Sequence, residues 1–175
     1  MSESMLGSQH NDTDNGRSGT GVPSSTATYV TFCLGSQTFG VEVTDVREIL
    51  DLQTLYTLPQ SLEDCEGVID TRGESIPVIN LARRLGLAGG ERGADTRIIV
   101  FEIAAHPGRR AIGVLADTVL DVEQIADDEI EPAPRAAFSG GGELALRGLA
   151  RLQENIVVLL DIDRVFGAGL PDLDA

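Results

Sequence analysis

Short apolar runs alternate with polar turn residues along most of the chain. This pattern predicts four β-hairpins, because each pair of apolar runs is joined by a turn rich in Gly, Pro or polar side chains. The predicted strand pairs are 29–34 with 39–43, 67–71 with 75–79, 97–103 with 110–116, and 144–152 with 156–160. No long amphipathic helix is predicted, so the pattern favours small β-barrels over an α/β sheet.

Short helical segments are predicted between the hairpins, over residues 44–50, 81–85 and 161–166. Thr44 is the candidate N-cap of the first segment. Its residues Val46, Ile49 and Leu50 fall at i, i+3 and i+4, the spacing of one helix face. Each of the other two segments follows a polar residue suited to an N-cap, namely Asn80 and Asp161.

An internal repeat supports a two-lobed fold. Segment 39–49 aligns without gaps on 112–122, and segment 67–86 aligns on 148–167. The second copy carries an insertion, which we place in 131–142 because this stretch is rich in Pro and Gly. A repeat of this length suits two similar small barrels that pack on each other, because neither copy alone holds much core.

Composition sets the limits of the folded part. Residues 1–27 are predicted to be a disordered tail, because Gly, Ser, Thr, Asn and Asp bury too little apolar surface to offset the loss of backbone entropy. Residues 169–175 are predicted to be a short C-terminal tail. The folded domain is therefore predicted to span 28–168.

The chain is strongly acidic, with 13 basic residues, all of them Arg, against 28 acidic residues and a net charge of −15. This charge argues against nucleic acid or an anionic membrane as a partner. No apolar run approaches the ~20 residues that cross a bilayer, and no secretory signal is recognised. Cys33 and Cys65 make neither a disulfide framework nor a zinc site, which indicates a reduced, cytosolic protein.

Arg72 is the clearest polar signal, in the predicted hairpin turn before Gly73. It is either a turn residue kept for solubility or a residue of a protein interface. The repeat favours the interface, because the equivalent positions carry Gln153 and Glu154, so the fold does not demand Arg-Gly here. An exposed Arg on a rigid turn contributes several hydrogen-bond donors and apolar area to an interface.

Other polar residues give weaker signals. Val46 and Glu48, whose repeat mates are Val119 and Asp121, are expected in the core and on a helix surface, with partner binding as the alternative. The acidic stretch 121–131 lacks the spacing of a calcium loop and is interpreted as a solvated face. No Ser/His/Asp or Cys/His set, metal set or phosphate loop is recognised, so we expect no catalysis and no cofactor.

The order of these motifs resembles the CheW-like chemotaxis coupling proteins. The resemblance covers about 28–168 and rests on Tyr-Val-Thr-Phe-Cys-Leu-Gly from Tyr29, Phe-Gly-Val-Glu-Val from Phe39, Val-Arg-Glu-Ile from Val46, and Gly-Val-Ile-Asp-Thr-Arg-Gly-Glu-Ser-Ile-Pro-Val-Ile-Asn-Leu from Gly67. It implies a pair of five-stranded SH3-like barrels with short helices. We place the junction of the lobes at about 87–96.

The resemblance implies a cytosolic adaptor recruited to membrane-bound receptor arrays. Its partners would be the cytoplasmic tip of a methyl-accepting chemoreceptor and the regulatory domain of the CheA histidine kinase. The candidate partner-binding residues are Arg72, Gly73, Val46, Glu48, Gly67 and Val122.

The chain departs from the family pattern at two places. Asp70 and Thr71 stand where Asn-Leu is usual before Arg-Gly, and Asn80-Leu81-Ala82 stands where Asp-Leu-Arg is usual. One alternative is therefore a coupling protein of a non-chemotaxis pathway that controls pili or a second messenger. The other is an enzyme on a β-barrel scaffold, which lacks a nucleophile–base pair.

Overall fold

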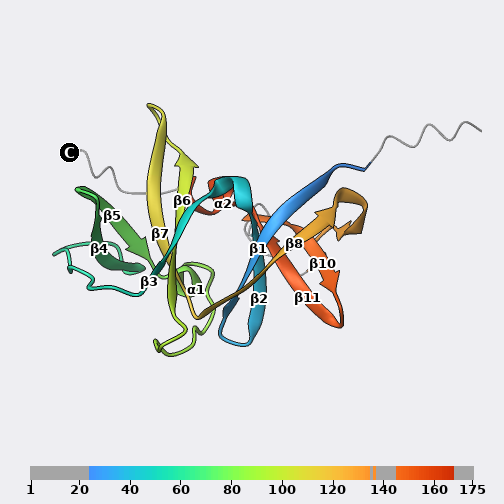
Figure 1. Ribbon diagram of the computed structural model, residues 1–175, viewed down its shortest axis with the longest axis horizontal. Helices are drawn as coiled ribbons and strands as arrows, with labels where there is room; N and C mark the ends of the chain where they lie inside the picture. Colours follow the sequence, from blue (N-terminus) through green and yellow to red (C-terminus); the bar gives the residue numbers. More distant parts are fainter. Residues whose placement is uncertain (1–23, 135, 137–144, 168–175) are drawn as a thin grey trace, which may run out of the picture.

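The computed structural model describes residues 24–134, 136 and 145–167, which form a mainly β protein (Figure 1). The predicted tail 169–175 and most of the predicted tail 1–27 and insertion 131–142 lie outside the described residues. The first strand already begins at Thr26, so the last residues of the predicted N-terminal tail belong to the fold.

Eleven strands and four short helices make up the described chain. The strands are β1 (Thr26–Leu34), β2 (Gln37–Glu42), β3 (Val46–Asp51), β4 (Cys65–Thr71), β5 (Glu74–Ile79), β6 (Arg97–Ala104), β7 (Arg109–Ala116), β8 (Thr118–Ala126), β9 (Ile130–Glu131), β10 (Leu146–Leu152) and β11 (Asn155–Leu160). The helices are α1 (Leu81–Arg84), α2 (Ile162–Phe166) and the 3₁₀ turns η1 (Val43–Asp45) and η2 (Asp127–Glu129).

The strands form two sheets, one of six strands in the order β8-β1-β2-β11-β10-β9 and one of five in the order β3-β6-β7-β5-β4. The four predicted hairpins are confirmed as antiparallel pairs. The prediction of five strands in each lobe is wrong for the first sheet, because the short strand β9 pairs with β10. In the second sheet the corresponding place is held by a single bridge between Tyr56 and Val68.

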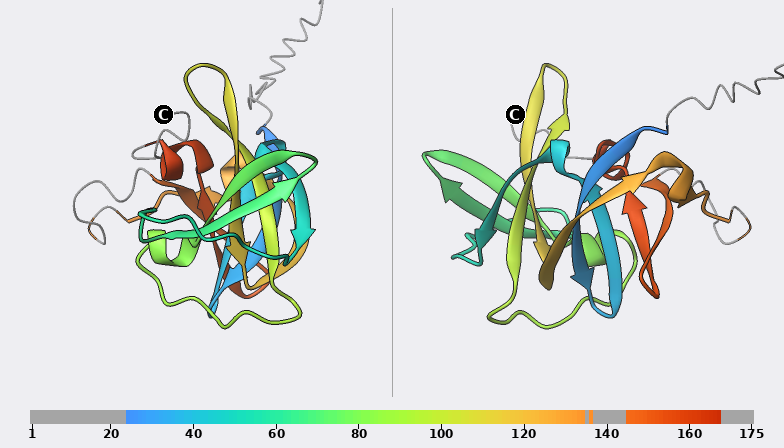
Figure 2. Two further views of the ribbon diagram at one scale, coloured as in Figure 1. Left: turned by 90° about the vertical axis from the view of Figure 1, so that its left-hand side faces the viewer. Right: turned by 45° about the vertical axis from the view of Figure 1, so that its right-hand side comes forward.

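The sheets are not successive halves of the chain, so the predicted junction at 87–96 is wrong. That segment connects α1 to β6 within the five-stranded sheet. The chain instead crosses between the sheets at η1 and returns at Asp117. Parallel pairing of β2 with β11 and of β5 with β7 then joins segments that are far apart in sequence. Figure 2 shows the β6–β7 hairpin extending beyond the other strands.

The predicted helix 44–50 is also wrong. Residues 43–45 form the turn η1, and the following residues form β3, whose side chains alternate between half-buried and exposed positions. Ile49, which the helical spacing placed on the apolar face, is 41% exposed. Pairing with β6 supplies the backbone hydrogen bonds, and this tertiary pairing outweighs the local spacing.

The largest hydrophobic core lies between the two sheets. Phe32 and Val41 come to it from the six-stranded sheet, Phe101 and Val114 from the five-stranded sheet, and Phe166 from α2. A smaller cluster around Ile69, Ile76 and Ile98 belongs to the five-stranded sheet alone, and another around Tyr29, Ile125 and Leu159 belongs to the six-stranded sheet alone. The lobes therefore share one core and each keep a smaller one.

Candidate partner-binding surface

Arg72 and Gly73 form a two-residue turn between β4 and β5, closed by the pair Thr71–Glu74. Their φ angles are 54° and 79°. Positive φ at both central residues matches the turns that suit the twist of a hairpin. The amide of Gly73 also donates to Oδ1 of Asp70 at 3.1 Å. The turn is thus held firmly, while the Arg72 side chain is 79% exposed.

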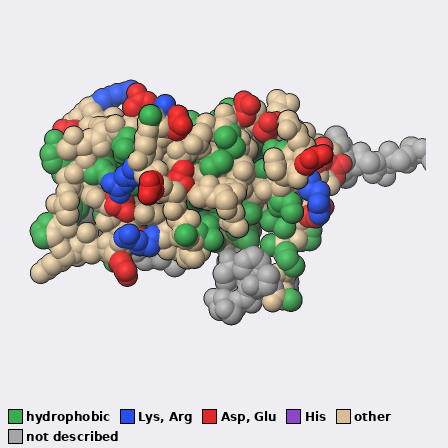
Figure 3. All heavy atoms as spheres, turned by 90° about the horizontal axis from the view of Figure 1, so that it is seen from below, with side chains coloured by type: hydrophobic (Ala, Val, Ile, Leu, Met, Phe, Trp, Pro, Cys, Tyr) green, Lys and Arg blue, Asp and Glu red, His purple; other side chains and the backbone are tan. Residues whose placement is uncertain are grey.

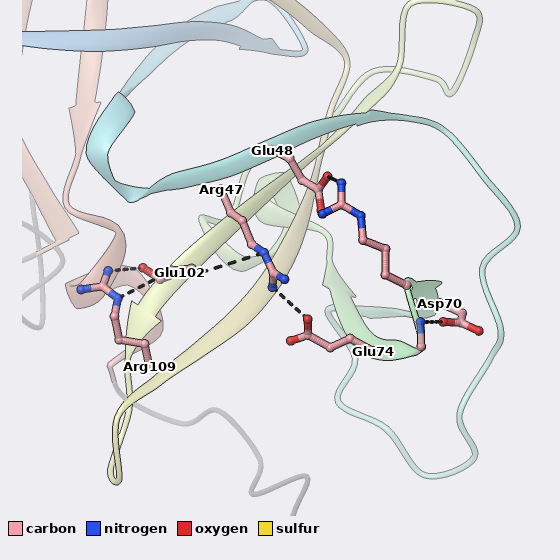
Figure 4. A network of polar contacts seen from close by, with 8 residues as sticks. Arg47, Glu48, Asp70, Glu74, Glu102 and Arg109 are labelled. Atoms are coloured by element: carbon pink, nitrogen blue, oxygen red, sulfur yellow. Dashed lines mark hydrogen bonds and ion pairs between the residues drawn. The ribbon is translucent and has the colours of Figure 1, made fainter.

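The Arg72 guanidinium lies beside Glu48 of β3, with 3.5 Å between Nη2 and Oε2 (Figure 4). The Glu48 side chain is only 19% exposed. Its other oxygen, Oε1, is buried and has no hydrogen-bond partner among the described residues. A buried acceptor without a partner is unfavourable, so the exposed part of this pair is the donor group of Arg72, and the unpaired acceptor lies beneath the surface.

Arg47 extends this surface. A β-bulge between Val46 and Glu48 leaves Arg47 without an opposite residue on β6, and bulges turn side chains away from the regular alternation. Its Nη1 lies 2.9 Å from Oε2 of Glu74, and its Nε lies 4.0 Å from Oε1 of Glu102. The hydrogen bond to Glu74 raises the pKa of Arg47 above its ordinary value.

Charged side chains of alternating sign therefore cross the five-stranded sheet. Glu102 also binds Arg109 of β7, with 3.7 Å between Oε2 and Nε, and this continues the row seen in Figure 4. Charges of opposite sign also lie next to one another on the face seen from below (Figure 3). Many arginines of this acidic chain are thus matched locally with carboxylates.

The structure brings together only part of the predicted set. Arg72, Gly73 and Glu48 meet, but Glu48 lies on a strand and not on the expected helix. Val46 is half-buried against the shared core, as expected for its core interpretation. Val122 lies on β8 of the six-stranded sheet and is 58% exposed.

Gly67 has a backbone role at the far end of β4 from the turn. Its φ is 141°, and an added Cβ would lie 2.7 Å from the carbonyl oxygen of Tyr56. The bridge between Tyr56 and Val68 needs this close approach, since its two hydrogen bonds measure 2.9 and 2.8 Å. Gly148 has the same conformation against Glu131 in the second copy.

Sequence reasoning missed Arg47 and Glu74. Arg47 precedes Glu48 in the sequence, and the predicted helix over 44–50 would have placed Arg47 away from the turn formed by Arg72 and Gly73. The repeat aligns β3 with β8, but neither segment was predicted as a strand, so the repeat offered no signal for the element type.

Among the described residues, no group of three or more His, Cys, Asp or Glu side chains is placed to hold a metal ion. Cys33 and Cys65 are free and half-buried. No helix in the described ranges is long and apolar enough to cross a membrane.

Comparison with known proteins places these features in a family. The probable chemotaxis protein CheW of Rhizobium etli is 31% identical over 137 residues, which cover 78% of this chain and 85% of that protein. Protein FrzA of Myxococcus xanthus is 35% identical over 103 residues, which cover 59% of this chain and 62% of that protein.

A solved structure agrees with the fold. The scaffolding protein TtCheW from Thermoanaerobacter tengcongensis superposes with a TM-score of 0.71 at 27% sequence identity, covering 81% of this chain and 88% of that one. The CheW-like domain matches residues 28–169, which include both sheets and the surface around Arg72. The chain therefore belongs to the CheW-like family.

Proposed function

We propose that the chain is a chemotaxis adaptor that holds the cytoplasmic tip of a chemoreceptor and the regulatory domain of a CheA-type histidine kinase in one complex. The observation that carries this proposal is the CheW-like match across both sheets. A relative named for chemotaxis and a structural neighbour named as a scaffolding protein support it. An adaptor needs two separate surfaces in a fixed arrangement, and two sheets on a shared core supply them.

The surface around Arg72 is the proposed receptor contact. The Arg72 guanidinium can pair with a carboxylate or carbonyl of the partner, since its planar fork carries several donors. Glu48 lies behind the guanidinium with 3.5 Å between Oε2 and Nη2, and its buried Oε1 is not accessible to a partner in this conformation. Gly73 has no side chain that could keep a partner away from the turn. Gly67 allows the close approach of β4 to the backbone of Tyr56.

Val46 and Val122 complete the proposed contacts in different ways. Val46 supports β3 from the core side, so its effect on binding is indirect. Val122 is exposed beside Leu120, which is 50% exposed, on the edge strand β8. Exposed apolar side chains on an edge strand suit a protein contact.

Each sheet with its connections is proposed to curl into an SH3-like barrel. The parallel pairs β2–β11 and β5–β7 bring distant strands into each sheet, and each sheet keeps a core cluster of its own. The protein is proposed to act without chemistry or a cofactor, in the cytoplasm, where receptor arrays recruit it.

Kinase autophosphorylation, titrated with the adaptor in the presence and absence of receptor-containing membranes, tests the coupling function. We expect stimulation only with receptor, a maximum at intermediate adaptor concentration, and inhibition at large excess, where separate binary complexes form. Equal stimulation without receptor, or none at any ratio with the cognate pair, would refute the proposal.

A coupling protein of a non-chemotaxis chemosensory pathway is the second candidate. The departures from the family pattern at Asp70-Thr71 and at Asn80-Leu81-Ala82 support it, because they alter the neighbours of the candidate contact residues. Co-purification from the native cell separates the two, because the candidates predict different receptor sets on the same adaptor.

A further inference from the structure

The helices α1 and α2 follow strands of different sheets and are linked by a side-chain contact. α1 follows β5 of the five-stranded sheet, and α2 follows β11 of the six-stranded sheet. Arg84 of α1 makes the contact. Its Nε donates to the carbonyl oxygen of Val165 at 3.2 Å, and its guanidinium carbon lies 5.1 Å from the centre of the Phe166 ring.

The same guanidinium also binds the connection between β3 and β4. Nη1 of Arg84 donates to Oδ2 of Asp64 at 2.9 Å. The two side chains are only 14% and 16% exposed. Removal of one partner of such a poorly solvated pair leaves the other charge uncompensated, so the pair resists rearrangement.

The contacts to α2 are directional. The Val165 carbonyl lies in the last turn of α2, where carbonyls lack a partner within the helix and attract a cation. The Phe166 ring is 1% exposed and packs in the core shared by the two sheets. Arg84 is thus connected to a buried part of the other lobe and not to a surface side chain.

The repeat shows that the fold alone does not demand Arg at this position. Arg84 aligns with Val165, whereas its neighbour Arg83 aligns with a second arginine, Arg164. Arg83 also differs in its contact, because its Nη1 donates to the Glu63 carbonyl oxygen at 2.7 Å, in the connection that leads to its own sheet. Of these two neighbouring arginines, Arg84 therefore makes the contact with α2, whereas Arg83 binds within its own lobe.

We infer that Arg84 is a positioning residue that fixes the angle between the two sheets by binding Asp64, the Val165 carbonyl and the Phe166 ring at once. The apolar core resists separation of the sheets, but apolar contact is non-directional. Directional bonds select the angle, and Arg84 acts beside the bonds of Asp117 to the Gly35 and Gly90 amides and of Asp163 to the Ala104 amide. The consequence for signalling rests on the proposed adaptor function, since partners held on different sheets need a fixed relative orientation.

Residual dipolar couplings of backbone amides test the angle in the intact chain without any partner. In the wild type, couplings from both sheets fit one alignment tensor. We expect that in Arg84→Gln each sheet still fits its own tensor, but the two tensors differ in orientation or magnitude. The matched control is Arg83→Gln, which removes a neighbouring arginine from the same helix and is expected to keep one common tensor.

A folded Arg84→Gln protein with one common tensor would overturn the inference, and so would an equal divergence in Arg83→Gln. If Arg84→Gln does not fold, Arg84→Lys takes its place. Lys keeps the charge beside Asp64 but cannot also bind Val165 and cover Phe166 with a planar group, so a divergence is again expected and a common tensor again overturns the inference. Because no receptor or kinase is present, failure here is distinguishable from failure of the adaptor proposal.

Discussion

Arg72 and Gln153 occupy the same place in two equivalent hairpins, and their φ angles are 54° and 56°. Left-handed conformations cost a residue other than Gly roughly 1–2 kcal/mol. Both copies of the repeat accept this strain with different side chains. The backbone shape is therefore what the fold needs at this turn, and the Arg72 guanidinium is available for another role.

Arg72→Glu is expected to keep the fold and to weaken receptor binding. Reversal of a charge at the centre of an interface typically costs about 2 kcal/mol or more. The substitution also places a second carboxylate near Glu48, which the wild-type guanidinium faces at 3.5 Å. Circular dichroism measures the fold, and a pull-down with the receptor tip measures the binding.

The control for this change is Arg72→Gln, which copies the residue of the second hairpin. It is expected to fold as well as the wild type and to bind with an affinity between those of wild type and Arg72→Glu. Unaltered binding by Arg72→Glu would show that Arg72 is not part of the interface. Loss of the fold would show that Arg72 is a structural turn residue.

Local chemistry made much of the fold predictable. The hairpins follow from short apolar runs between turn residues. The caps follow from side chains that bond nearby amides: Asn80 accepts from the Arg83 amide at 3.0 Å, and Asp161 accepts from the Arg164 amide at 3.2 Å. The Arg72 turn was recognised from its sequence and from the repeat.

The remaining features depend on contacts between distant segments. β3 was predicted as a helix because a bulge at Arg47 disturbs its alternation, so that the sequence lacks a clear strand pattern. β8 was missed because its outer residues Leu120 and Val122 are apolar and exposed. The pairing of Arg72 with Glu48 requires both β3 and the crossing of the chain at η1. The local spacing of apolar and polar residues predicts neither of these features.

Gly67→Ala is expected to destabilise the protein more than Gly73→Ala. Both glycines have positive φ, but an added Cβ at Gly67 would lie 2.7 Å from the Tyr56 carbonyl oxygen, whereas at Gly73 it would meet nothing within 4 Å. We expect the free energy of unfolding to fall by about 1 kcal/mol in Gly73→Ala, from backbone strain, and by about 3 kcal/mol in Gly67→Ala, from strain plus the clash. Urea unfolding measures both; equal losses would contradict a structural need for the close approach.

Asp117→Ala is expected to loosen the point where the chain returns to the six-stranded sheet. Oδ2 of Asp117 accepts from the amides of Gly35 at 2.5 Å and Gly90 at 2.8 Å. Hydrogen bonds to a charged group each contribute about 1.5–3 kcal/mol. Hydrogen exchange should become faster at these two amides while the amides of β6 and β7 stay protected; unchanged exchange at Gly35 and Gly90 would contradict the assigned bonds.

Ionisation of Asp45 and of Glu66 is expected to change the stability of the fold in opposite directions. Burial raises the pKa of Asp45, the nearby carboxylates of Asp163 and Glu42 raise it further, and Arg109 and Arg147 oppose this without reversing it. The folded state therefore keeps this proton where the unfolded state has lost it. Ionised Asp45 therefore destabilises the fold. The resulting loss in free energy of unfolding grows as pH rises from the ordinary pKa, about 3.9, through the raised pKa of the folded state.

The pKa of Glu66 is shifted in the opposite direction. Burial alone would raise its pKa, but hydrogen bonds from Asn80 and Arg92, together with the positive charge of Arg92, lower it below the ordinary value. Ionised Glu66 thus stabilises the fold above its ordinary pKa, about 4.3, and this contribution is lost as pH falls through the lowered pKa of the folded state.

At pH 7 we therefore expect Asp45→Asn to raise the urea unfolding midpoint and Glu66→Gln to lower it. The difference of each variant from the wild type should shrink as pH falls through the corresponding window, because the native carboxyl group then becomes neutral like its substitute. Unfolding midpoints of both variants and the wild type at pH 7 and at pH 3 measure these differences. Shifts of the same sign at pH 7 would mean that side-chain shape, and not the charge at these two sites, controls the response.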